Sequence, residues 1–510
     1  MKKISLILLI LSLMLIFAAC GGDSNENPDG GNTPPATDSS DDQNKPEEIK
    51  YSQGLEFISR GEGNCSLKGI GSCTDTDILV PPTSPSGESV TAIDASAFEG
   101  VSTIVSITLP AEIEEIGHYA FKGCTALTKV SYSEESALME IGYEAFAGCK
   151  ALVEMHIPAD VMKIGNAAFK NCTALDNVTF EEGSVLEGIA YETFRGCTAL
   201  RFVAIPDGIT AVGESAFRNC INYGKNLILP ESVVSIGDTA FSNCEKLEYV
   251  SLPSTLETIG EKAFFGCKSL KKMLVAEDSA TFKSVNNVLY SVDGKTLILY
   301  AMGRTEASFE IPAGVTAIAP HSFAYSGNLK SVSIPTGVES IGTQAFLGCE
   351  SLETVVIPDG LRTISGSAFY NCRGLVSVTI SRDVTSIGSS AFYNCSSLTE
   401  IKVAAGNTKY KDIDGNLYSY NGKELIQYAC GKTATSFVVP EGVTTIKNYA
   451  FAYCESLSSV SIPSSVTKIS KGSFLGCESL SEIHFAGTES QWTNIGLTGD
   501  DINNAAVHYN

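Results

Sequence analysis

The sequence predicts a repeat solenoid built from short β-strands. First, a phenylalanine followed three positions later by a cysteine recurs at short, nearly constant intervals, as at Phe121, Phe146 and Phe169. Second, each unit carries an apolar alternation that stops at a proline, which is typical of a short strand. Third, a unit this short has an apolar face that only a stacked neighbour can cover. The fourteen in-register phenylalanines are Phe98, Phe121, Phe146, Phe169, Phe194, Phe217, Phe241, Phe264, Phe323, Phe346, Phe369, Phe392, Phe451 and Phe474.

The unit CESLETVVIPDGLRTISGSAFYNC, residues 349–372, shows which elements each repeat should contain. Val355 and Ile357 alternate before a proline and predict the first short strand. A turn follows, then a second extended stretch that ends at Ile364. A short helical or 3-10 segment should carry Phe369. Stacking such units should make one continuous core.

The N-terminal stretch MKKISLILLILSLMLIFAAC predicts export. Two lysines, an apolar run too short to cross a bilayer and a pair of small residues indicate a signal peptide over residues 1–19. The small-small-Cys ending is similar to the lipobox of bacterial lipoproteins, which implies that Cys20 is lipidated and anchors the chain. An ordinary signal peptide cleaved near this point is the alternative. Residues 20–50 are otherwise rich in Gly, Pro, Ser and acids and should form a disordered tether.

The charge of the chain excludes one class of partner. Thirty-five Lys and Arg residues against 58 Asp and Glu residues give a formal net charge of −23. Nucleic-acid affinity depends on neutralising phosphates, so we expect no nucleic-acid partner. No second apolar stretch is long enough for a membrane span, and we expect membrane contact through the lipid anchor only.

The repeat consensus L-x-x-V-x-I-P…V-x-x-I-G-x-x-A-F-x-x-C resembles that of the BspA-like leucine-rich-repeat (LRR) surface proteins. The match extends over nearly all of residues 90–487, and we assign the repeats to residues 98–487. The resemblance implies a curved, right-handed solenoid. It also implies an exported protein associated with adhesion to host or neighbouring-cell components.

Two interruptions and two ends depart from the regular repeat. Inserts near residues 275–310 and 403–438 are copies of each other and align without gaps. Each has an Asp-Gly or Asn-Gly pair between apolar runs, which predicts an inserted β-hairpin that projects from or braces the solenoid. The ends of an array need covered outer faces. Residues 51–97 should form an N-terminal cap of two or three strands, and residues 488–510 a C-terminal cap in which Trp492 covers the last coil.

The repeat cysteines should be buried free thiols that pack as small hydrophobic side chains. Metal-binding cysteines come in closely spaced pairs, whereas these lie at least a full repeat apart, so no metal site is expected. Stacked coils bring equivalent positions near disulfide range, and pairing remains the alternative. Cys430 aligns with Met302 of the sister insert, which indicates packing. Cys65 and Cys73 lie outside the repeats, eight residues apart in an exported chain, and are the plausible disulfide pair.

No catalytic motif stands out. The five histidines are scattered, and the chain has no G-x-S-x-G, H-E-x-x-H or P-loop sequence. We therefore predict that the chain is not an enzyme and uses no cofactor. A hydrolase built on one of the inserts is the remaining alternative.

The exposed row beside the Val-x-Ile strands is the predicted ligand face, because alternate strand residues point away from the core. Its aromatic members could anchor a protein interface or a sugar ring. Most of the outward row is Ser or Thr, which also suits a strand that faces only water. The residues singled out as a ligand face are Lys129, His156, Phe202, Tyr249 and Lys402.

These observations predict a non-catalytic adhesion protein that presents its LRR solenoid to other proteins, such as host matrix or other cells. We expect a monomer, lipid-anchored in the cell envelope on the outer surface of a bacterial cell, with an extracellular protein or glycan as ligand. The alternative is a glycan-binding or periplasmic envelope scaffold protein.

Overall fold

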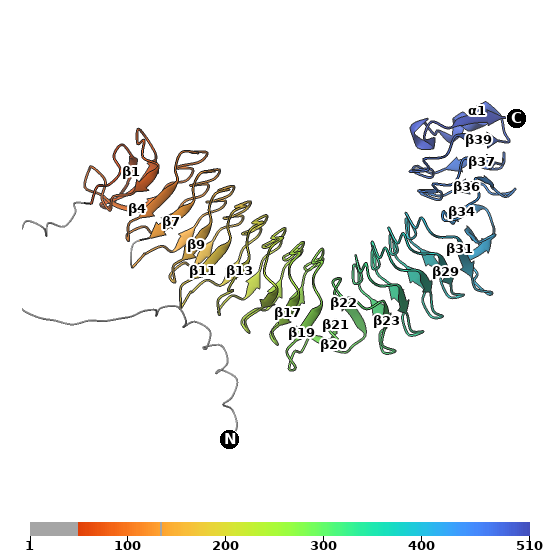
Figure 1. The fold of residues 1–510 in the computed structure, drawn as a ribbon, viewed down its shortest axis with the longest axis horizontal. Coiled ribbons are helices and arrows are strands. Elements are labelled where there is room, and N and C mark those ends of the chain that lie inside the picture. The colour runs from red at the N-terminus through yellow and green to blue at the C-terminus, as the bar shows by residue number, and fades with distance from the viewer. Residues whose placement is uncertain (1–48, 133–134) are drawn as a thin grey trace, which may run out of the picture. The chain divides into compact units, whose positions relative to one another are not determined.

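The computed structural model describes residues 49–132 and 135–510, and these residues form a solenoid of stacked short strands (Figure 1). The predicted signal peptide, the lipidation site Cys20 and nearly all of the tether lie outside the described residues. No helix in the described ranges is long and apolar enough to cross a membrane.

The first strand of each coil is the predicted Val-x-Ile alternation. These strands pair in parallel with their equivalents one coil away, as Ile107 pairs with Val130. Inward residues such as Ile107 are buried, and the residues between them face outward. We call these strands the first strand row. They are β3 (Asp77–Leu79), β5 (Ser106–Leu109), β7 (Lys129–Tyr132), β9 (Glu154–Ile157), β11 (Asn177–Phe180), β13 (Phe202–Val203), β15 (Asn226–Ile228), β17 (Tyr249–Leu252), β19 (Lys272–Val275), β23 (Ser308–Glu310), β25 (Ser331–Ser333), β27 (Thr354–Val356), β29 (Ser377–Ile380), β31 (Glu400–Val403), β35 (Ser436–Val438), β37 (Ser459–Ile462), β39 (Glu482–Phe485) and β40 (Ala506–Tyr509).

A second, mostly two-residue strand follows in each coil, at the predicted extended stretch. It ends at Ile or Val and also pairs in parallel with its neighbours, as Ile341 pairs with Ile364. We call these strands the second strand row. They are β4 (Ser89–Ile93), β6 (Glu115–Ile116), β8 (Glu140–Ile141), β10 (Lys163–Ile164), β12 (Gly188–Ile189), β14 (Ala211–Val212), β16 (Ser235–Ile236), β18 (Thr258–Ile259), β24 (Ala317–Ile318), β26 (Ser340–Ile341), β28 (Thr363–Ile364), β30 (Ser386–Ile387), β36 (Thr445–Ile446) and β38 (Lys468–Ile469).

The third side of each coil is a chain of turns, where we had predicted a short helical or 3-10 segment. Alternate N–H groups bond within the coil, as Lys122 donates to the carbonyl of Tyr119 at 2.9 Å. The intervening ones bond to the next coil, as Phe121 donates to Ala145 at 2.7 Å. Tyr119 has a φ of 60°, which interrupts any helix. The hydrogen bonds of the segment are therefore divided between two coils, and it does not form a helix.

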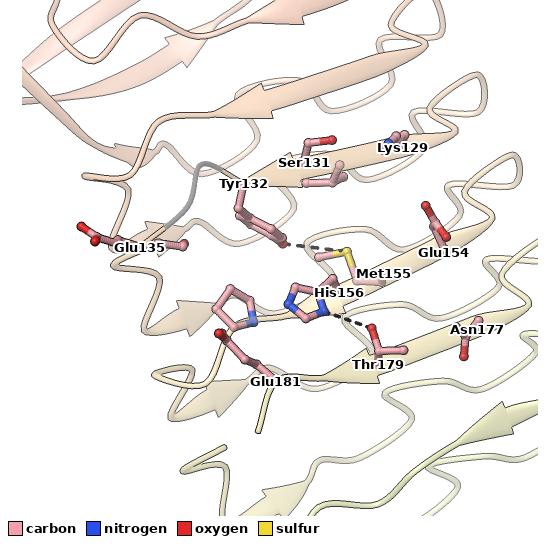
Figure 2. A pocket seen from close by; sticks show the side chains of 13 residues that line it. Lys129, Ser131, Tyr132, Glu135, Glu154, Met155, His156, Asn177, Thr179 and Glu181 are labelled. Atoms are coloured by element: carbon pink, nitrogen blue, oxygen red, sulfur yellow. Dashed lines mark hydrogen bonds between the residues drawn. The ribbon is translucent and has the colours of Figure 1, made fainter. Parts of the chain in front are cut away.

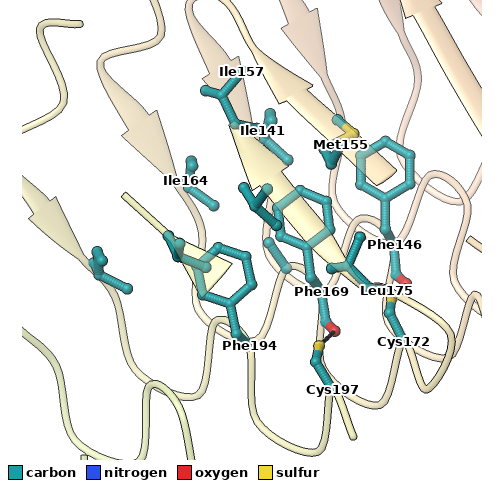
Figure 3. Close-up of a cluster of buried hydrophobic side chains, with 14 of the residues drawn as sticks. Ile141, Phe146, Met155, Ile157, Ile164, Phe169, Cys172, Leu175, Phe194 and Cys197 are labelled. Carbon is teal, nitrogen blue, oxygen red and sulfur yellow. Dashed lines mark hydrogen bonds between the residues drawn. The ribbon is translucent and has the colours of Figure 1, made fainter. Parts of the chain in front are cut away.

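Stacked phenylalanine rings form the centre of the core (Figure 3). From Phe98 to Phe264 successive rings stack with centroids 5.1 to 5.6 Å apart. The buried residues do not form the single continuous core that we predicted. They form an N-terminal core cluster, a middle core cluster that begins at Val288 and a C-terminal core cluster that begins at Tyr418. The boundaries lie at the two inserts.

Each insert is a three-stranded antiparallel meander, so the predicted hairpin is present with a second one before it. Its last strand joins the second strand row, since β22 pairs in parallel with β24 and β34 with β36. The inserts therefore brace the solenoid. Their strands are β20 (Phe282–Val285), β21 (Val288–Ser291), β22 (Thr296–Leu299), β32 (Tyr410–Ile413), β33 (Asn416–Ser419) and β34 (Glu424–Gln427).

Both ends of the described solenoid carry additional elements. At the N-terminal end, β1 (Glu56–Gly61) and β2 (Asn64–Gly69) form an antiparallel hairpin, and β2 continues into the second strand row through β4. At the C-terminal end, the helix α1 (Glu489–Ile495) begins at a capping box, and a 3-10 turn spans Asp500–Ile502. Trp492 of α1 is buried against Phe485 of the last regular coil, with ring centroids 5.4 Å apart, where a lid was predicted.

Candidate binding face on the first strand row

Strand alternation builds a regular outward face on the first strand row. In β9, Met155 and Ile157 are buried, whereas Glu154 and His156 are exposed. The parallel register places His156 beside Thr179 of β11. Outward side chains from successive coils therefore stand in columns roughly 4.8 Å apart, and two neighbouring parts of this face have a distinct chemistry.

The five residues predicted to form the ligand face all lie on this row. Lys129, His156, Phe202 and Lys402 are exposed, and Tyr249 is half-buried. The structure brings Lys129 and His156 into one cleft, and Phe202 and Tyr249 into one apolar patch, as described below. Lys402 lies apart from both, on β31, where it pairs with Glu400 at 2.9 Å.

The first distinct part is a polar cleft of about 430 Å³ over β7, β9 and β11 (Figure 2). In the described chain β7 and β9 belong to different sheets, and the cleft lies across this break. The unit from Phe121 to Phe146 is longer than the next one, from Phe146 to Phe169, and its extra chain follows β7.

The cleft offers both signs of charge and several hydrogen-bonding groups. The His156 Nδ1 atom lies 3.1 Å from the Thr179 hydroxyl. The Tyr132 hydroxyl donates to the Met155 sulfur at 3.9 Å, and burial raises the pKa of this phenol. Lys129 forms no ion pair with any residue that the structure describes. The remaining charged residues that line the cleft are Glu135, Glu154 and Glu181.

The second part is a group of apolar side chains on β15, β17 and β19, together with Phe202 on β13, which ends the preceding sheet one coil earlier; we call this group the apolar patch. Phe202, Ile228 and Leu274 are 55%, 68% and 39% exposed. Ile228 and Leu274 occupy one column on either side of Ser251, and Tyr249 belongs to the strand between them. A cluster of large exposed apolar side chains costs free energy in water, so it marks an interaction surface more often than scattered residues do.

Charged residues surround the apolar patch. Arg201, next to Phe202, makes a bidentate ion pair with Asp176, which lowers the pKa of that carboxyl group. Lys271 bonds to Glu248 at 3.4 Å and likewise holds the pKa of Glu248 below its usual range. An apolar centre with a polar rim is the usual composition of a protein-protein interface.

Sequence reasoning missed Ile228 and Leu274. Each lies within an apolar run, Leu227–Leu229 and Met273–Val275, in which residue type does not distinguish outward from inward positions. Reading the outward column past Ser251 in both directions would have found them, because the register pairs Ser251 with both.

Hydrogen bonds show what the repeat cysteines do in the fold. Each ladder thiol donates to the carbonyl oxygen of the phenylalanine one coil earlier, as Cys197 does to Phe169 at 3.0 Å (Figure 3). Burial raises the pKa of these thiols, to about 12 for Cys267. Within the described ranges, no group of three His, Cys, Asp or Glu residues is placed to hold a metal ion. The other thiol donors are Cys124, Cys149, Cys172, Cys220, Cys244, Cys267, Cys349, Cys372, Cys395 and Cys477.

Three expectations about disulfides need correction. Cys430 is not a mere packing residue, because it forms a disulfide with Cys454 of the next coil, with Cα atoms 4.4 Å apart. Cys454 is a repeat cysteine that was predicted to be a free thiol, and it is paired. It comes two positions after Tyr428 and not three, so its sulfur leaves the regular thiol position. Cys65 and Cys73 have free, buried thiols. Cys65 lies near the start of β2, and the rest of this extended strand, at about 3.3 Å per residue, separates it from Cys73.

Comparison with known proteins places this repeat in a family. The model described as "BspA type Leucine rich repeat region (6 copies)" matches residues 91–224, 223–291, 316–423 and 423–497. No curated protein matches the chain.

Several solved structures are similar over most of the chain. A leucine rich cell surface protein from Faecalibacterium prausnitzii is 26% identical, over 88% of this chain and 97% of that one, with a TM-score of 0.45. The pneumococcal vaccine antigen PcpA is 20% identical, over 91% and 98%, with a TM-score of 0.44. A leucine-rich repeat protein from Bacteroides ovatus is 22% identical, over 91% and 100%, with a TM-score of 0.38. Because these TM-scores are below 0.5, the assignment rests on the family model, which matches well over half of the chain. The chain belongs to the BspA-type leucine-rich-repeat proteins.

Proposed function

We propose that this chain is a non-catalytic binding protein of the bacterial cell surface that docks a protein partner on the first strand row. The observation that carries the proposal is the apolar patch of Phe202, Ile228, Tyr249 and Leu274 inside a charged rim. The polar cleft adjoins the patch on the same row and adds the ammonium group of Lys129, which has no ion-pair partner among the described residues. Affinity comes from the apolar centre, and the charged groups select the partner.

The cell-surface part of the proposal rests on the N-terminal sequence and the family. The signal peptide over residues 1–19 exports the chain, Cys20 carries the lipid, and the tether holds the solenoid away from the membrane. The chain acts as a monomer, and domain limits of 51–97 for the N-terminal cap and 488–510 for the C-terminal cap complete this organisation.

A binding experiment with matched variants tests the docking surface. The purified chain is presented to a panel of extracellular-matrix and cell-surface proteins and to a glycan array. We expect binding to a protein, and Ile228→Ala together with Phe202→Ala should weaken it at least tenfold, as loss of a hot spot does. Val438 has the same 68% exposure as Ile228 on a distant strand, so Val438→Ala is the control.

The outcomes separate the candidate functions. Binding that depends on Val438 as much as on Ile228 contradicts the assigned patch. Binding to sugars that is lost in Phe202→Ala and Tyr249→Ala supports the glycan-binding alternative, because exposed aromatic rings stack on sugar rings. Absence of binding across the panel and the array counts against adhesion altogether.

A protease experiment on intact cells tests the location. A non-penetrating protease should cleave the chain while a known periplasmic protein survives. Protection until the cells are lysed contradicts surface exposure and favours the envelope scaffold.

A further inference from the structure

Interior coils share their backbone hydrogen bonds along one edge. The carbonyl of Ile236 accepts from the Gly260 N–H of the next coil at 2.7 Å. The Phe241 N–H donates to the Ala263 carbonyl of the next coil at 2.8 Å. The I-G-x-x-A-F segment of each coil therefore fits against the same segment of the coil before it, with a fixed register.

This edge ends at β18, the last strand of its sheet, because the first insert follows. No residue in the described part of the chain is placed to bond the carbonyl of Ile259 or the N–H groups of Lys262, Phe264 and Gly266. Phe264 and Gly266 are buried, so water reaches these donors poorly. Buried backbone groups are nearly always paired, and an unpaired row of them is a template for another strand.

The final side chain of the strand at this edge is also more exposed than its equivalents in the other coils. In the other two-residue strands of the second strand row the final Ile or Val is buried, as Ile236 is. At β18 and at β30, the last strands before the two inserts, Ile259 and Ile387 are only half-buried. Only these two residues of the row are partly exposed, which indicates that they lack the regular coil that covers the others.

A groove of about 320 Å³ lies against the open edge at β18. Its walls combine the unpaired backbone of Lys262 and Phe264 with apolar side chains from the insert and with Ala319, Pro320 and His321 of the following coil. The His321 ring packs edge-on against Phe265, with ring centroids 6.0 Å apart. The insert residues that line the groove are Leu289, Ile298, Leu299 and Met302.

The second insert offers a comparison, because β30 also ends its row and the Ile387 carbonyl and the Phe392 N–H there have no backbone partner in the described part of the chain either. In the alignment of the two inserts, Ile387 corresponds to Ile259 and Tyr410 to Phe282. The Ile387 N–H donates to the Tyr410 hydroxyl at 2.9 Å, a bond that Phe282 cannot offer. The groove there is also more polar, since Gln427 stands where the first groove has Leu299. The groove at β18 is therefore the more apolar copy of a duplicated pair, and its strand edge lacks the bond that the Tyr410 hydroxyl makes in the other copy.

We infer that the groove at β18 binds an extended peptide segment of a partner protein, which adds to the sheet as a parallel strand. This surface is separate from the first strand row and would be a second binding site. The free donors and acceptor follow the spacing of a polypeptide backbone, so a lipid chain or a small apolar molecule would leave them unpaired. Apolar residues of the peptide cover Ile259. A small residue of the peptide fits at the point where its backbone comes closest to that of the neighbouring coil.

The probe for this site can be taken from the chain itself. The peptide VSIGDTAFS, residues 234–242, is the sequence that one repeat places in the equivalent slot. Its glycine N–H would donate to the Ile259 carbonyl, and its alanine carbonyl would accept from the Phe264 N–H. The same peptide with an N-methylated glycine is the matched control, because it lacks that donor.

The test measures fluorescence anisotropy of the labelled peptide with the full chain, and hydrogen exchange of the chain with and without peptide. We expect saturable binding and slowed exchange in residues 257–267, and at least fivefold weaker binding of the N-methylated peptide. Phe282→Tyr introduces the hydroxyl that bonds the strand N–H in the second copy, so it should compete with the peptide at this edge and weaken binding about fivefold to tenfold. Leu299→Gln should weaken it similarly, whereas Tyr410→Phe should leave binding at this groove unchanged.

Three results would overturn the inference. These are no saturable binding, slowed exchange confined to the first strand row, and equal affinity of the wild type and Phe282→Tyr while that variant keeps the wild-type melting temperature. Slowed exchange of residues 257–267 that appears without peptide as the protein concentration rises would make the occupant a second copy of this chain.

Discussion

The cysteine of each repeat is suited to a narrow task. It fills a small apolar space and donates a weak hydrogen bond to a phenylalanine carbonyl one coil away, as Cys220 does to Phe194 at 3.1 Å. Serine is a poorer fit: Ser326 occupies the same position, and its buried hydroxyl has no partner in the described structure. The thiols therefore act as packing groups with a polar contact.

These thiols should make the fold sensitive to alkali. Burial raises the pKa of Cys267 to about 12, whereas an unfolded cysteine ionises near pH 8.5. The unfolded chain therefore loses its proton first, so the stabilisation is complete below about pH 8.5 and is lost as pH rises toward 12. We expect the free energy of unfolding to fall by up to about 1.4 kcal/mol per pH unit for each such thiol. Urea titrations at pH 7.5, 8.5 and 9.5 check this.

Cys267→Ala is the control for the alkaline effect, because it removes one thiol and should make the decline with pH less steep. A wild-type free energy that stays constant up to pH 9.5 would contradict the prediction.

Two phenylalanines should differ sharply in their effect on stability. Phe169 is fully buried in the ring stack, so Phe169→Ala should lower the free energy of unfolding by about 3 to 5 kcal/mol. Phe202 is 55% exposed, and Phe202→Ala should change it by no more than about 0.5 kcal/mol. Chemical denaturation of both variants measures the difference. Equal losses would mean that Phe202 packs in the fold and is unsuitable as a binding probe.

At the scale of elements, the strands and inserts could be predicted because their signals are local. Val-x-Ile alternation and Asp-Gly or Asn-Gly turns need no knowledge of neighbouring coils. The conformation of the turn segment around Phe121 could not be predicted, because half of its N–H groups bond to the next coil and not within their own coil. The candidate binding face was half predicted: Phe202 and Tyr249 stood out as aromatic, whereas Ile228 and Leu274 were hidden in apolar runs.

The disulfide at the second insert should stabilise the C-terminal core cluster. Cys430 and Cys454 close a loop with a sequence separation of 24, for which loss of chain entropy in the unfolded state predicts about 3 kcal/mol. Cys430→Ala, or reduction of the wild type, should therefore lower the melting temperature of the C-terminal cluster. The first insert has Met302 at this position, so Met302→Ala is a control whose effect is insensitive to reductant. Wild-type stability that does not change on reduction would contradict the prediction.

At the scale of the whole molecule, the two inserts set the units of cooperativity. In a solenoid each coil contacts only its neighbours, so stability is a sum of local terms. The ring stack runs from Phe98 to Phe264 and resumes at Tyr300 with Phe323. It resumes again at Phe451 with Phe474, where Tyr428 lies tilted against Phe451. Unpaired backbone at β18 and β30 weakens the coupling between clusters at the same two places. The duplicated inserts thus also mark the boundaries between the core clusters.

We therefore expect unfolding in more than one step, with each step confined to one core cluster. Phe451→Ala removes a ring of the C-terminal cluster. It should lower the urea concentration at which residues 418–507 unfold and leave the other transitions unchanged. Phe169→Ala should lower only the urea concentration at which the N-terminal cluster unfolds, so each variant is the control for the other. Hydrogen exchange at increasing urea concentration assigns each transition to its residues, because amides of one cluster become exposed together. A single transition that includes all three clusters and shifts equally in both variants would show that the inserts transmit cooperativity, and the unpaired edges at β18 and β30 would then have little energetic consequence.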